Sequence, residues 1–146
     1  MKVIHARYGL LALILSLAAS TPALSAPRDA VRSASGDSGR TCYLAGTEKR
    51  KSSRGVHQWT VRQLDRWCVR DGRVISVRQT LEVETGAGWR LVSKNGTTRT
   101  DGDGEAVSKG RFHLSRDGGN ERSCYPRITA TLLPTGEADY DADAGC

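Results

Sequence analysis

The sequence lacks most of the residues and motifs on which enzymes depend. Only three histidines occur among its 146 residues, and His57 and His113 alone lie outside the N-terminal export signal described below. No nucleophile, metalloprotease or cofactor-binding motif is present, so we expect no cofactor. The balance favours a protein that is not an enzyme. The alternative that stays open is a small hydrolase that cleaves phosphodiesters, with the two imidazoles acting as general acid and base.

Long hydrophobic runs are scarce as well. The apolar run Leu10–Ala19 follows a short basic start and precedes small residues, which is typical of a secretory signal. It is well short of the roughly 20 residues that a membrane-spanning helix needs, and no later stretch approaches that length. We therefore expect residues 1–25 to be a signal peptide cleaved near Ser25, no transmembrane segment, and a secreted or periplasmic product.

The four cysteines lack the close spacing of structural zinc sites, which argues against a metal role. In an exported chain of this size two structural disulfides are the expected outcome. Four cysteines allow three connectivities, and the preferred one is Cys42–Cys68 with Cys124–Cys146, because both loops are short. Each bridge would stabilise the fold by roughly 2–4 kcal/mol.

Helical periodicity is absent from the chain. Residues 26–40 are rich in Ser, Gly, Asp and Arg and predict a flexible leader. From residue 41 to 146, short runs alternate apolar and polar residues between Gly and Asp turns, which indicates one all-β domain. We expect an antiparallel β-sandwich of about seven short strands, immunoglobulin-like or prealbumin-like. The segment Thr100–Ala106 resembles the turn between strands in some bacterial sandwiches of these two kinds and favours the same architecture.

The same alternation places individual strands and their buried faces. The residues expected to point into the core are Trp59, Val61, Trp67 and Val69 on one strand, Ala106, Phe112 and Leu114 on a second, and Cys124, Ile128, Ala130 and Leu132 on a third. Turns are expected at residues 86–88, at Asn95-Gly96, at residues 101–104 and at residues 117–119. The three tryptophans are assigned to the core rather than to a sugar-binding platform. The expected strands are Val56–Val69, Arg73–Thr85, Trp89–Ser93, Thr97–Thr100, Glu105–Leu114 and Cys124–Leu133.

The hairpin around Asp71 and Gly72 allows a prediction of register. A three-residue loop with Gly72 in a bulge keeps the two apolar faces together and places Trp67 opposite Ile75. This register leaves Asp65 on the apolar face, where an unpaired carboxylate is costly. Three explanations stay open: a bulge turns Asp65 outward, an arginine pairs with it, or it belongs to a site.

Positive charge predominates, with a formal net charge of +6, and it is unevenly distributed. Residues 28–70 hold ten Lys or Arg against four acids, and the densest cluster is Lys49, Arg50, Lys51 and Arg54. Such a cluster is a candidate site for an anionic polymer. It is also compatible with a solvated loop that is partly neutralised by the acidic C-terminal segment.

A second candidate is a stripe of Lys109, Arg111 and His113. These residues alternate along one expected strand and would form a basic face about 13 Å long. The acidic turn at Asp101 and Asp103 alternates as calcium ligands would, but the rest of the calcium-loop pattern fails. We therefore expect no metal site.

Together these features predict a secreted, non-catalytic recognition module that binds an extracellular protein or an anionic polymer. Nucleic acid is not the expected partner. Besides the hydrolase, a second alternative is a secreted inhibitor of an enzyme, whose contact loop would be Ser115–Ser123. The oligomeric state cannot be inferred from the sequence.

Overall fold

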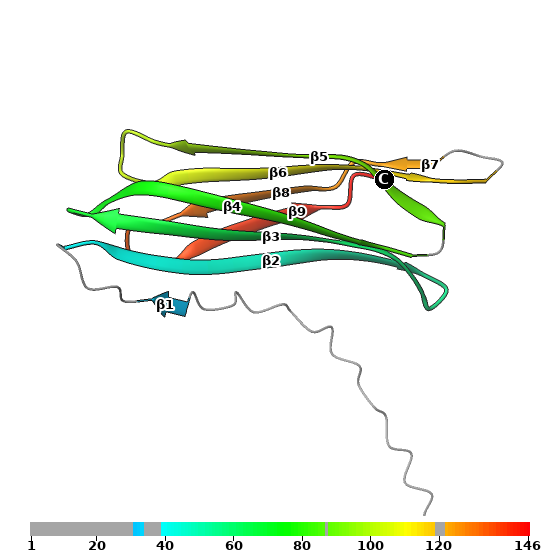
Figure 1. The fold of residues 1–146 in the computed structure, drawn as a ribbon, viewed down its shortest axis with the longest axis horizontal. Helices are drawn as coiled ribbons and strands as arrows, with labels where there is room; N and C mark the ends of the chain where they lie inside the picture. The colour runs from blue at the N-terminus through cyan, green and yellow to red at the C-terminus, as the bar shows by residue number, and fades with distance from the viewer. Residues whose placement is uncertain (1–30, 34–38, 87, 119–121) are drawn as a thin grey trace, which may run out of the picture.

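The computed structural model describes residues 31–33, 39–86, 88–118 and 122–146. The expected signal peptide and its cleavage point near Ser25 lie outside these residues. Within them the chain forms two antiparallel sheets that pack face to face, as the two layers of strands in Figure 1 show. The predicted β-sandwich is confirmed, and so are both predicted disulfides, Cys42–Cys68 and Cys124–Cys146. No helix in the described segments is long and apolar enough to cross a membrane.

Each sheet is a meander of strands that follow one another in sequence. The first sheet has the order β1 (Val31–Ser33), β2 (Thr41–Ser53), β3 (Val56–Arg70) and β4 (Arg73–Thr85). The second has the order β5 (Trp89–Thr100), β6 (Ala106–Arg116), β8 (Arg127–Leu132) and β9 (Ala138–Asp143), and β7 (Arg122–Cys124) pairs with the end of β6. The exchange of strands between sheets that marks immunoglobulin Greek keys does not occur among the described strands.

Several elements differ from the sequence-based expectation. The short β1 lies within the segment 26–40 that was expected to be a flexible leader, and it pairs with β2. The predicted turn at Asn95-Gly96 is wrong, because β5 runs through it and Gly96 lies opposite Gly110 of β6. The expected strand Cys124–Leu133 is divided into β7 and β8 around Pro126, whose nitrogen cannot donate to a ladder.

The predicted register of the β3–β4 hairpin is wrong by two residues. Asp71 and Gly72, with φ of 52° and 70°, form a two-residue turn that sets Arg70 opposite Arg73. An irregularity in the ladder then leaves Ile75 unpaired, so Trp67 lies opposite Val77. This bulge restores the alignment of the two apolar faces that a two-residue turn alone would lose.

The core consists of two apolar clusters between the sheets. Trp67 anchors one cluster together with Val69 and Leu132, and Trp59 and Trp89 anchor the other. All three tryptophans are buried, which confirms their assignment to the core. The predicted inward faces of β3, β6 and β8 are confirmed as well, since their apolar residues supply most of both clusters.

A buried polar layer lies among these apolar residues. Asp65 is fully buried and accepts hydrogen bonds from Gln63 Nε2 (2.8 Å), Ser108 Oγ (2.6 Å) and Tyr140 Oη (3.2 Å). Gln79 Nε2 also donates to Ser108 Oγ (2.8 Å), so the network joins both sheets. Neither an outward turn nor an arginine partner explains Asp65, and both of those explanations are wrong. Burial raises the pKa of Asp65, and the three hydrogen bonds offset part of that rise.

Glycine at position 110 makes room for this polar layer. A Cβ at Gly110 would lie 2.6 Å from Gln63 Oε1 and 2.8 Å from Leu81 Cδ2. We expect Gly110→Ala to lower the free energy of unfolding by about 1–3 kcal/mol through overpacking, measured by urea unfolding. Gly102→Ala is the control, because a Cβ there meets nothing within 4 Å. Equal stability of the two variants would show that the layer can repack freely.

Candidate anion-binding surfaces

The first predicted basic cluster is dispersed by strand alternation. Lys49 and Lys51 lie opposite Val61 and Trp59, on the core-facing side of the first sheet, and both are half-buried. Arg50 lies on the outer side and is exposed, whereas Arg54 occupies the β2–β3 turn with φ of 50°. The structure therefore does not bring these four residues together as one surface.

The second predicted cluster does share one face. Lys109 and Arg111 are exposed on the outer side of β6, His113 is half-buried on the same side, and Arg127 of β8 lies opposite Arg111. The acidic residues of β9 flank this stripe on the other side of β8: Asp139, Asp141 and Asp143 are paired with Thr131, Thr129 and Arg127. Two strand spacings amount to about 10 Å, so the acidic strand offsets part of the positive potential.

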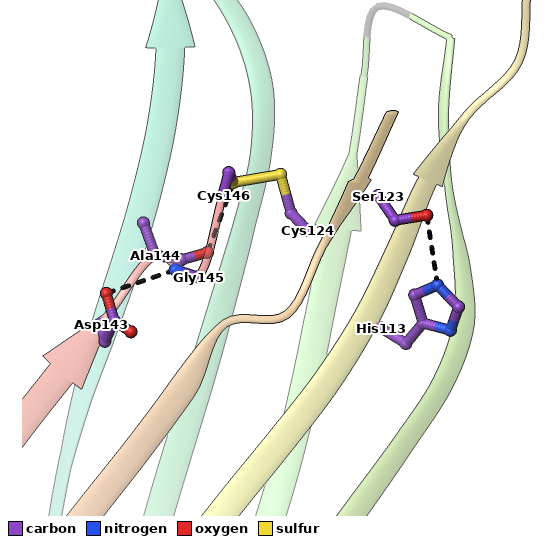
Figure 2. Close-up of a disulfide and its surroundings, with 7 residues drawn as sticks. All are labelled: His113, Ser123, Cys124, Asp143, Ala144, Gly145 and Cys146. Atoms are coloured by element: carbon purple, nitrogen blue, oxygen red, sulfur yellow. Dashed lines mark hydrogen bonds between the residues drawn. A yellow bond between two sulfur atoms is a disulfide. The ribbon is translucent and has the colours of Figure 1, made fainter. Parts of the chain in front are cut away.

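The two histidines lie in different sheets with separate partners. His57 Nε2 is 2.9 Å from Thr60 Oγ1 within β3. The His113 ring stacks on Tyr125 with a centroid distance of 4.6 Å, and its Nε2 lies 3.4 Å from Ser123 Oγ (Figure 2). The geometry therefore gives no support to a mechanism that uses both imidazoles on one substrate.

The candidate contact loop Ser115–Ser123 is shorter than the sequence suggested. In the segment Ser115–Ser123, residues 115 and 116 end β6, residues 122 and 123 belong to β7, and residues 119–121 lie outside the described part. At the acidic turn, the Asp101 carboxylate pairs with Arg99 at 3.1 Å. The described residues contain no group of three or more potential metal ligands.

The outer face of the first sheet is divided into two halves of different charge. In one half, Arg62 Nε lies 2.9 Å from Glu48 Oε2 and Arg62 Nη2 lies 3.5 Å from Glu84 Oε2. The hydrogen bond to Glu48 raises the pKa of Arg62. This half is internally neutralised by its own ion pairs.

The other half carries arginines around the Cys42–Cys68 disulfide. Arg40, Arg66 and Arg78 line a concavity of about 340 Å³ together with this disulfide. Arg66 and Arg78 lie directly opposite each other on β3 and β4, and Arg40 Nη2 donates to Ser76 Oγ at 3.3 Å. Among the described residues none of the three forms an ion pair with a carboxylate. Like charges directly opposite each other destabilise a sheet, so the fold gains nothing from this pair.

Closer to the β3–β4 turn, beyond the pair Cys68 and Ser76, a second pair of arginines lies opposite each other. Arg70 lies opposite Arg73, and both side chains are exposed. We call the set Arg40, Arg66, Arg70, Arg73 and Arg78 the arginine face. Sequence reasoning missed it. The signal that could have found it is the presence of Arg66 and Arg70 on the side of β3 opposite to Trp59 and Trp67.

Comparison of this chain with protein-family models, with curated proteins and with solved structures finds no match. Function is therefore inferred from the chemistry of the surface.

Proposed function

We propose that this protein is an exported recognition module that binds an acidic polysaccharide through the arginine face. The observation that carries the proposal is the direct opposition of Arg66 and Arg78 around a concavity in the sheet, with no acidic partner among the described residues. Their mutual repulsion would be relieved by an anion between them. The two disulfides fit an oxidising compartment, where such polymers are found.

The chemistry of arginine suits the repeating charges of such a polymer. A guanidinium donates two parallel hydrogen bonds to a carboxylate or sulfate, and the planar geometry makes the contact specific. Arg66 and Arg70 are four residues apart on β3, which corresponds to about 13 Å along the strand. The Cys42–Cys68 bridge joins β2 to β3 beside Arg66, on the same face, and holds this part of the sheet in place.

The described residues favour polysaccharide over single-stranded nucleic acid. Proteins that bind single strands without sequence preference stack bases on exposed aromatic rings. All three tryptophans are buried, and the exposed large apolar residues of the first sheet are aliphatic, such as Leu44 and Leu64. The arginine face therefore offers charge and hydrogen-bond donors without a stacking platform.

The proposal is tested by affinity chromatography and titration with heparin and with polygalacturonate as probes. We expect Arg66→Gln/Arg78→Gln to elute at lower salt and to weaken binding about ten-fold, because each lost contact is a charge-assisted hydrogen bond. Lys109→Gln/Arg111→Gln removes the same charge from the other sheet and should change the affinity by less than three-fold. Arg62→Gln is a single-charge control on the same face.

Two outcomes would contradict the proposal. One is the absence of salt-sensitive retention of the unmodified protein on either probe. The other is a loss of affinity in the Lys109→Gln/Arg111→Gln variant that equals or exceeds the loss at Arg66 and Arg78, which would place binding on β6.

A further inference from the structure

A second basic concavity lies at the end of the sandwich where the β2–β3 turn approaches β7. Figure 1 shows both elements at this end, together with the C-terminal segment. The cleft has a volume of about 480 Å³, within the range of small-molecule sites. The Cys124–Cys146 disulfide forms part of its wall, and Figure 2 shows this bridge joining the C-terminal segment to the end of β7.

Three cationic side chains line this cleft from both sheets. Arg116 and Arg122 lie directly opposite each other on β6 and β7, two residues beyond the buried pair Leu114 and Cys124. By strand alternation they project from the core-facing side, past the end of the core. Lys51 lines the cleft from the first sheet. In the described part of the chain, none of the three forms an ion pair with an acid.

An independent observation comes from Trp89, which also lines the cleft. Its side chain is 7% exposed, and its Nε1–H is buried without a hydrogen-bond partner among the described residues. An indole N–H can only donate, and an orphaned buried donor is unusual in a native protein. Trp59 Nε1 is a second buried donor of this kind, and of the two only Trp89 lines this cleft. A bound oxyanion would supply the missing acceptor once the Trp89 indole turned toward the cleft, because its Nε1 is buried in this structure.

We propose that this end cleft binds the phosphate groups of a small ligand. The donors come from four strands, β2, β5, β6 and β7, and therefore surround a bound group instead of lying in one plane. Such an arrangement fits a tetrahedral oxyanion, with three or four acceptor oxygens, better than a planar carboxylate. The site is distinct from the arginine face and goes beyond the function proposed above.

This proposal is tested by titrating the protein with pyrophosphate, inorganic phosphate or sulfate. Calorimetry measures the binding, and the NMR resonances of the indole N–H groups report on the tryptophans. We expect saturable binding of pyrophosphate, weaker binding of the two single anions, and a shift of the Trp89 indole resonance, which Trp89→Phe identifies by its loss. Arg116→Gln and Arg122→Gln should each weaken pyrophosphate binding about ten-fold. Both residues are exposed, so the variants should fold, which circular dichroism checks.

Arg90→Gln is the matched control, because Arg90 adjoins Trp89 but pairs with Asp117 at 2.9 Å. This variant should keep its affinity for pyrophosphate within two-fold. Arg66→Gln/Arg78→Gln should do the same, and this second control separates the end cleft from the arginine face. The proposal is overturned if pyrophosphate does not saturate at millimolar concentration. An equal loss of affinity in Arg90→Gln and Arg122→Gln, or an unmoved Trp89 resonance, would also overturn it.

Discussion

Replacing Asp65 by alanine is expected to lower the free energy of unfolding by about 3 kcal/mol. The carboxylate accepts hydrogen bonds from Gln63, Ser108 and Tyr140, which belong to both sheets. Its removal leaves the Ser108 and Tyr140 hydroxyls without this acceptor in the interior, where an unsatisfied polar group costs about 1–3 kcal/mol. Ser108 is fully buried, so water cannot easily replace the carboxylate there.

Urea unfolding at pH 7, followed by tryptophan fluorescence, measures this change. The control is Asp141→Ala, which removes the same group from an exposed position on β9 and should alter stability by less than about 0.5 kcal/mol. A loss below 1 kcal/mol at Asp65 would mean that the polar layer is held by its other hydrogen bonds.

The raised pKa of Asp65 gives the same experiment a pH dependence of defined sign. Because burial raises the pKa in the folded state above the ordinary value of 3.8, the folded protein holds this proton to higher pH than the unfolded chain. The stabilisation that comes from protonating Asp65 in the folded state is therefore complete below about pH 3.8, and it is lost as the pH rises through the folded-state pKa of Asp65. Asp65→Asn lacks this titration, so the stability of the unmodified protein relative to this variant should increase as the pH falls.

Removing the Cys124–Cys146 disulfide by Cys124→Ala/Cys146→Ala is expected to cost about 3 kcal/mol. The bridge closes a loop with a sequence separation of 22, and the loss of chain entropy in the unfolded state gives this magnitude. It also holds the C-terminal segment against the connection between β7 and β8, where Tyr125 N donates to Gly145 O at 2.9 Å. The variant should therefore lose hydrogen-exchange protection at Tyr125 as well as global stability.

Denaturant unfolding of Cys124→Ala/Cys146→Ala is compared with that of Cys42→Ala/Cys68→Ala. In the unmodified protein the Cys42–Cys68 bridge closes a loop with a similar sequence separation of 26 and joins directly paired strands. Both variants should show losses of similar size, in the range of 2–4 kcal/mol. A variant without the Cys124–Cys146 bridge that kept full stability and full protection at Tyr125 would contradict this role.

The architecture could be predicted because the relevant signals are local. Alternation along the chain identified Trp59, Val61 and Trp67 as one buried face, and the short loops between cysteines favoured the connectivity that the structure has. Such signals depend on neighbouring residues in sequence and need no knowledge of the partner strand.

The register and the surfaces could not be predicted because they depend on pairing across strands. The bulge at Ile75 has no glycine or proline to mark it, and the predicted register would have set Arg66 opposite Ser76 instead of Arg78. The opposition of Arg66 and Arg78 could therefore not be predicted, although the alternation of β3 does place Arg66 and Arg70 on its outer side. Likewise, the run from Lys49 to Lys51 resembled a cluster along the chain, although β2 distributes its members over two faces.

Asp65 shows a different limit. The sequence placed this carboxylate correctly on an inward face, but its partners Ser108 and Tyr140 are 43 and 75 residues away in the chain. They come from the second sheet, and only the packing of the two sheets brings them to Asp65.

The central claim, that the arginine face binds an anionic polymer, is tested most directly by the salt dependence of heparin binding. The slope of log K against log salt concentration reports how many cationic side chains neutralise the polymer. The slope of Arg66→Gln/Arg78→Gln should be smaller than that of the unmodified protein by about 1.4–1.8, since each of the two lost contacts contributes roughly 0.7–0.9. The slope of Lys109→Gln/Arg111→Gln should differ from that of the unmodified protein by less than about 0.5. Identical slopes for the unmodified protein and Arg66→Gln/Arg78→Gln would contradict the claim.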